Sequence, residues 1–121
     1  MREILFRGKS IDNGKWIYGY AAMSGGTFII CDNGLTYGGF IVYEVIPETV
    51  GQFTGLTDKN GVRIFEGDIL QYEWSGKKNI DYIEYSGNMF TYSECIRFSL
   101  SDDEVIGNIH DNPEILNNSS L

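Results

Sequence analysis

Residues 49–70 read TVGQFTGLTDKNGVRIFEGDIL, and no other part of the chain constrains the fold as much. Glycines at positions 51, 55, 61 and 67 fall among β-branched, aromatic and turn-forming residues. Glycine at this density indicates backbone that adopts positive φ or that approaches another segment closely. We therefore expect two short strands here, joined by a tight turn at Asn60-Gly61.

The acidic residues of this segment have two interpretations. Asp58, Glu66 and Asp68 could bind a divalent cation or divide the roles of general acid and base. Asp side chains also commonly accept hydrogen bonds from backbone amides in turns, and Arg63 is available as an ion-pair partner. We therefore expect a structural signature rather than a catalytic site. Its residues are Gly51, Gln52, Thr54, Gly55, Asp58, Gly61, Glu66, Gly67 and Asp68.

Alternation of apolar and polar residues predicts short strands along the rest of the chain. The expected strands cover residues 4–7, 15–20, 27–31, 40–46, 68–74, 80–85, 89–92, 94–100 and 104–109. Asn13-Gly14 and Asn33-Gly34 are typical of two-residue hairpin turns. Asn112 is a good helix N-cap and Pro113 suits a first helical position, so we expect a short helix over residues 112–116. Residues 117–121 are expected to fray.

The length of 121 residues fits one domain over residues 1–121. Many short strands separated by turns, with almost no helical periodicity, indicate a mainly β fold. We expect a small barrel-like, partly SH3-like arrangement of short antiparallel strands, followed by a short C-terminal helix.

The net charge of −8 is unevenly distributed, because residues 1–20 carry a local charge of +2. The acidic remainder disfavours nucleic acid over most of the surface, since it repels phosphates. No apolar run approaches the ~20 residues that cross a bilayer, and the N-terminus lacks a signal-peptide pattern. We expect a cytoplasmic protein without a membrane partner. Cys31 and Cys95 lie in apolar stretches, which favours two buried thiols but leaves a disulfide open.

The sequence offers little material for a catalytic centre. His110 is the only histidine, and beside Asp111 it is expected to be a surface or capping residue. A zinc site takes about four Cys or His ligands, more than two isolated cysteines and one histidine supply. We expect no enzymatic activity, no metal and no cofactor. A carboxylate- or metal-dependent enzyme is the least favoured alternative.

The N-terminal hairpin is the best binding candidate. Cationic residues accompany aromatic ones there: Arg7, Lys9, Lys15, Trp16, Tyr18 and Tyr20. Cations beside exposed aromatic rings are what single-stranded nucleic-acid platforms use. In the alternative interpretation, Trp16 and Tyr18 face the core and the lysine stems lie at its rim.

Three ordered blocks of the chain resemble the YopX family, small proteins encoded by bacteriophages and prophages of Firmicutes. The blocks are FRGK (6–9) with WIYG (16–19); TVGQFTGL (49–56) with DKNG (58–61) and IFEGDI (64–69); and VIGNI (105–109) with NPEIL (112–116). The resemblance implies a β-rich, barrel-like fold and a phage or prophage setting in a bacterial cytoplasm. It implies no activity, because the family has no established one.

Our first expectation is therefore a non-enzymatic binding or interaction module for a host or phage macromolecule. An oligomer with exposed strands paired between subunits fits the same interpretation. The alternative is a single-stranded nucleic-acid-binding module that uses the basic-aromatic hairpin.

Overall fold

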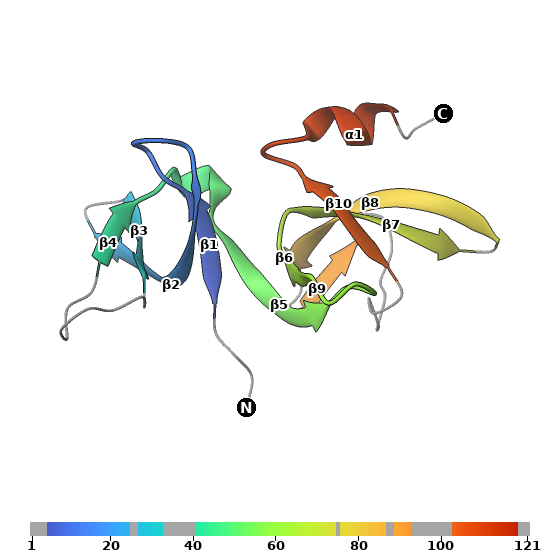
Figure 1. Ribbon diagram of the computed structural model, residues 1–121, viewed down its shortest axis with the longest axis horizontal. Coiled ribbons are helices and arrows are strands. Elements are labelled where there is room, and N and C mark those ends of the chain that lie inside the picture. Colours follow the sequence, from blue (N-terminus) through green and yellow to red (C-terminus); the bar gives the residue numbers. More distant parts are fainter. Residues whose placement is uncertain are drawn as a thin grey trace. The chain divides into compact units, whose positions relative to one another are not determined.

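The computed structural model describes residues 5–24, 27–32, 41–74, 76–86, 89–92 and 103–118. The fold is mainly β, with two antiparallel sheets and one short C-terminal helix, which confirms the predicted class (Figure 1). Contacts within the chain divide it into two compact units, Met1–Phe53 and Thr54–Leu121. The expectation of a single domain over residues 1–121 stays a prediction. None of the described helices is long and apolar enough to cross a membrane.

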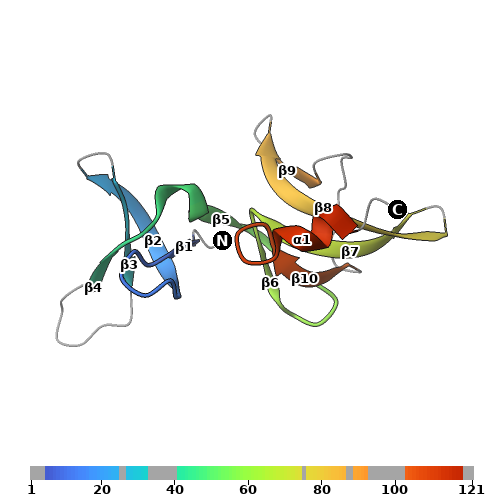
Figure 2. The same ribbon diagram turned by 90° about the horizontal axis from the view of Figure 1, so that it is seen from above.

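The first unit is built from neighbouring antiparallel strands in the order β4-β3-β2-β1-β5 (Figures 1 and 2). Its elements are β1 (Phe6–Lys9), β2 (Trp16–Ser24), β3 (Thr27–Asp32), β4 (Ile41–Glu44), the 3₁₀ helix η1 (Pro47–Thr49) and the start of β5 (Gly51–Thr57). β4 ends at Glu44, two residues before the predicted end at 46, and Pro47 begins the 3₁₀ helix.

The sheet of the first unit curls so that the residue after β4 meets the residue after β1. Ser10 and Val45 form an antiparallel bridge, and both are buried. The backbone amides of Ile11 and Ile46 donate hydrogen bonds of 3.0 and 2.9 Å across the same contact. This contact is an isolated bridge outside the named strands, so the described strands form no closed barrel. The mainly β class is confirmed, but the predicted barrel-like arrangement is an open, curled sheet, and the SH3-like part stays a prediction.

The second unit contains the rest of β5 beside β6, and a four-stranded sheet in the order β10-β7-β8-β9. Its elements are β6 (Arg63–Phe65), β7 (Asp68–Trp74), β8 (Lys77–Ser86), β9 (Met89–Tyr92), β10 (Glu104–Asn108) and the helix α1 (Pro113–Asn118). Along β7, Leu70 and Tyr72 share one buried face, and Ile69 on the other face is buried as well. The core residues packed together are Ile64, Leu70, Tyr72, Ile83 and Val105.

Several element boundaries differ from the predicted ones. The hairpin at Asn13-Gly14 exists, but its loop spans residues 11–14 because Ser10 pairs with Lys15 through a 2.9 Å backbone hydrogen bond. The Asn13 side chain accepts a 2.9 Å hydrogen bond from the Lys15 amide, which stabilises this longer loop. The turn at Asn33-Gly34, the strand at 94–100 and Cys95 lie outside the described residues.

Asp58 organises the loop between β5 and β6. One carboxylate oxygen, Oδ1, accepts hydrogen bonds from the backbone amides of Asn60 (2.8 Å) and Val62 (2.9 Å). The other oxygen, Oδ2, accepts one from the amide of Val105, 3.0 Å away and 47 residues later in the chain. The side chain is only 4% exposed. Asp58 therefore joins a local turn to β10.

Gly67 shapes the turn between β6 and β7. Its φ of +92° is in the region that favours glycine, and its amide donates a 2.8 Å hydrogen bond to the carbonyl of Ile83. A Cβ here would lie 3.5 Å from Nε2 of His110, so the imidazole packs against this turn. Asp68 completes the turn, since its Oδ2 accepts a 2.7 Å hydrogen bond from the amide of Phe65.

Candidate functional site

The candidate site is one face of the β1–β2 hairpin in the first unit. Residues opposite each other in an antiparallel pair share a face of the sheet. Arg7 lies opposite Tyr18, and Lys9 lies opposite Trp16. Tyr20 is two residues beyond Tyr18 on the same strand and therefore shares the face. We call Arg7, Lys9, Trp16, Tyr18 and Tyr20 the β1–β2 face.

Two cationic side chains of the neighbouring strand lie over the ring of Trp16. The guanidinium carbon of Arg7 is 4.6 Å from the centroid of the Trp16 ring, and Nζ of Lys9 is 5.7 Å from it. Both distances fall within the range of a cation–π interaction. Arg7 is only 6% exposed, whereas Lys9 and Trp16 are half-buried. The buried guanidinium of Arg7 therefore packs on the indole ring from the interior side. Lys9 is the more exposed of the two cations.

The end of β1 that carries Lys9 is fixed by η1. The backbone amide of Lys9 donates a 2.9 Å hydrogen bond to Oγ1 of Thr49, and this hydroxyl donates a 2.6 Å hydrogen bond to the carbonyl of Ile46. Thr49 is buried. Hydrogen bonds therefore fix the strand backbone from which the Lys9 side chain extends.

The two tyrosines of the β1–β2 face are open to solvent. Tyr18 is 47% exposed and Tyr20 is 52% exposed. An apolar side chain continues the face on β4, because Tyr20 pairs with Cys31 and Cys31 pairs with Val42, which is 55% exposed. Large side chains this exposed and on one face are typical of binding surfaces.

The structure brings five of the six predicted binding residues together on one face. Lys15, the sixth, is exposed at the loop end of the hairpin, directly before β2. Sequence reasoning missed Val42, although the alternation of residues 40–46 gave a usable signal. Placing Val42 on the same face as Tyr20 required the strand register, which the sequence alone did not supply.

The two units differ in charge. The first contains four Lys or Arg and five Asp or Glu, which gives −1. The second contains five Lys or Arg and twelve Asp or Glu, which gives −7. The β1–β2 face therefore belongs to the nearly neutral unit.

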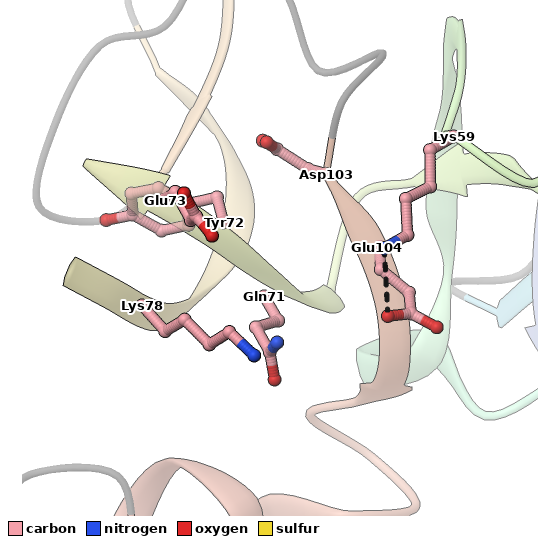
Figure 3. Close-up of a pocket in the computed structure, with 7 residues that line it drawn as sticks. All are labelled: Lys59, Gln71, Tyr72, Glu73, Lys78, Asp103 and Glu104. Atoms are coloured by element: carbon pink, nitrogen blue, oxygen red, sulfur yellow. Dashed lines mark ion pairs between the residues drawn. The ribbon is translucent and has the colours of Figure 1, made fainter. Parts of the chain in front are cut away.

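The second unit has a polar pocket of about 420 Å³ (Figure 3). Its lining, among the described residues, is Lys59, Gln71, Tyr72, Glu73, Lys78, Asp103 and Glu104. Lys59 and Glu104 form an ion pair of 3.7 Å at the rim, while Asp103 extends away from Glu104 at the start of β10. Both partners of the ion pair are largely exposed, so it adds at most about 1 kcal/mol. Opposite charges are mixed in this lining, and it favours no single ligand charge.

Two of the signature acids, Asp58 and Asp68, accept hydrogen bonds from backbone amides. Burial alone would raise the pKa of Asp58, but hydrogen bonds from the amides of Val105, Val62 and Asn60, with Lys59 nearby, bring the pKa below its ordinary value. The described residues contain no group of three His, Cys, Asp or Glu side chains placed to hold a metal ion.

The remaining signature residues lie along β5 and its turns. Gly51 pairs with Arg7 and Gln52 pairs with Phe6. The buried hydroxyl of Thr54 donates a 2.8 Å hydrogen bond to the carbonyl of Ile64. Gly55 and Gly61 have positive φ, and Glu66 lies in the turn before Gly67.

Comparison with known proteins identifies the family. A search of curated proteins gives no match. Among solved structures, the crystal structure of protein EF1440 from Enterococcus faecalis is similar, with a TM-score of 0.65 and 26% sequence identity. The similarity covers 96% of this chain and 99% of that one. The family model described as "YopX protein" matches residues 5–117, nearly the full length, so the chain belongs to the YopX family.

Proposed function

We propose that this chain is a non-enzymatic binding module that holds a macromolecular partner on the β1–β2 face. The observation that carries the proposal is the solvent exposure of Tyr18 and Tyr20 beside the cations on Trp16. Tyrosines contribute large contact areas at a small entropic cost, which is why they are enriched at interfaces. Because a hydrogen bond fixes the end of β1, little conformational entropy is lost there when a partner binds.

The proposal places the protein in a bacterial cytoplasm as a phage or prophage accessory protein. Its support is membership of the YopX family together with the sequence blocks quoted above. The partner is a host or phage macromolecule. A non-enzymatic role is supported by the backbone hydrogen bonds of Asp58 and Asp68, which give these carboxylates a structural task.

Site-specific photocrosslinking tests this proposal. The photoreactive amino acid benzoylphenylalanine replaces Tyr20 in the full chain, which is then irradiated in an extract of a Firmicutes bacterium. The control carries the same group at Val62, which lies in the second unit and is 47% exposed, close to the exposure of Tyr20. We expect discrete adducts from position 20 and none from position 62.

Competition makes the result specific to the face. Excess unmodified protein should suppress the adducts at position 20, and the Tyr18→Ala variant should suppress them much less. Adducts that form equally from both positions, or none from position 20, would contradict the proposal. Adducts between two copies of the chain would also contradict it, because they would identify the face as a self-association surface.

A further inference from the structure

We infer that the partner held by the β1–β2 face is a single-stranded nucleic acid. This inference rests on the proposed function and names the chemistry of its partner. Single-strand-binding surfaces combine aromatic rings on which bases stack with cations that follow the phosphates. On this chain both features occur on one hairpin, within the register pairs Arg7–Tyr18 and Lys9–Trp16.

The aromatic part of the surface is Tyr18 and Tyr20. They project from the same face of β2, separated by one residue, and are 47% and 52% exposed. Same-face neighbours along a strand are separated by about 7 Å, roughly twice the ~3.4 Å between stacked bases of a duplex strand, so the two rings suit the unstacked bases of an extended single strand. Two successive bases can therefore each occupy one ring.

The cationic part lies on the β1 side and at the loop end of the hairpin. Lys9 is half-buried with its ammonium over Trp16, and Lys15 is exposed next to the same tryptophan. Arg7 is buried, so it positions Trp16 rather than contacting the partner itself. The first unit as a whole carries −1 and the second −7, so a phosphate chain meets least repulsion on the first.

The charges also indicate the path of the nucleic acid across the sheet. Glu44 is exposed on β4, two residues beyond Val42 and on the same face. Its carboxylate disfavours phosphates at the β4 side of the sheet. The nucleic acid therefore follows the β1–β2 hairpin from Lys15 toward Tyr20 and does not cross to Val42.

Fluorescence anisotropy with labelled oligothymidine and oligouridine of about 10 nucleotides, and with a duplex of the same length, tests the inference. We expect saturable binding of the single strands by the full chain at low salt. Two accessible lysines predict a slope of log K against log salt of about −1.4. The duplex should bind more weakly, because its bases are not free to stack on Tyr18 and Tyr20.

Variants locate the binding. Tyr18→Ala and Tyr20→Ala should each weaken binding between about 5-fold and 100-fold, and Tyr18→Phe should restore it, since stacking needs the ring and not the hydroxyl. Lys9→Gln should make the salt slope shallower by about 0.7. The matched controls are Lys77→Gln and Val62→Ala on exposed positions of the second unit. They should leave the affinity unchanged.

Other outcomes overturn the inference without ambiguity. Absence of binding at low salt, equal affinity for duplex, or affinity unchanged in folded Tyr18→Ala would each do so. If photocrosslinks from position 20 still formed and resisted nuclease but not protease, the proposed binding face would stand with a protein partner. If neither oligonucleotides nor crosslinks were observed, both the inference and the proposed function would fail.

Discussion

Removing the Asp58 carboxylate should destabilise the protein, because this side chain joins the β5–β6 loop to β10. In Asp58→Ala, the backbone amides of Asn60, Val62 and Val105 lose their acceptor. A buried amide without an acceptor costs about 1–3 kcal/mol, and because water reaches these donors in part we take the lower value for each. The expected loss is about 3 kcal/mol in the free energy of unfolding, a substantial part of the ~5–15 kcal/mol typical of proteins.

The same contacts make this contribution dependent on pH. Because the pKa of Asp58 is lowered in the folded state, its ionised form stabilises the fold at every pH above the ordinary value of 3.8. That stabilisation is lost as the pH falls from there through the lowered pKa. The difference in unfolding free energy between native protein and Asp58→Ala should therefore be constant near neutral pH and shrink below about pH 4.

Urea denaturation, followed by tryptophan fluorescence and circular dichroism across this pH range, measures both effects. Glu114→Gln is the matched control, because it removes an exposed carboxylate of the same unit and should change stability by less than about 0.5 kcal/mol. The reasoning is refuted if Asp58→Ala loses less than about 1 kcal/mol, or if its difference from native protein grows in acid.

Three further substitutions test the local packing of the second unit. Gly107→Ala places a Cβ 2.7 Å from Oδ1 of Asn112, so we expect α1 to shift and its amides to lose protection in hydrogen exchange, while unchanged protection would contradict this. Gly67→Ala must adopt a φ of +92° and should lower the unfolding free energy by about 1–2 kcal/mol in urea titrations; a neutral result would mean that the turn relaxes. Thr54→Val removes the hydrogen bond to the Ile64 carbonyl, with an expected loss of about 1–2 kcal/mol in thermal unfolding, and a rise in stability would refute it.

The fold class could be predicted from the sequence because local signals are strong in a chain of short strands. Alternation from Asp68 to Trp74 marks β7 with the predicted boundaries, and β4 lies within the predicted range 40–46. The length of a loop was harder to predict. The Asn13-Gly14 dipeptide predicted a two-residue turn, but side-chain acceptors on Ser10 and Asn13 favour a longer loop.

The candidate site was predictable as a set of residues but not as a surface. Period-two alternation places Trp16, Tyr18 and Tyr20 on one face whatever the fold. Whether that face is buried depends on what lies over it, and this is a tertiary property. Ser10 and Val45 form a bridge between the ends of β1 and β4, and both are buried on the inner face of the curled sheet. Tyr18 and Tyr20 lie on the other face and are exposed. Likewise, the contact of Asp58 with Val105 joins segments too distant in sequence for any local pattern to reveal.

Mapping amide chemical shifts on titration with oligothymidine shows directly whether the β1–β2 face binds single strands. The account predicts that the largest perturbations lie in β1 and β2, at Lys9, Lys15, Tyr18 and Tyr20, with little change in β7, β8 or around Asp58. Perturbations centred on the polar pocket of the second unit, or shifts spread evenly over both units, would contradict it. So would an absence of perturbation at low salt.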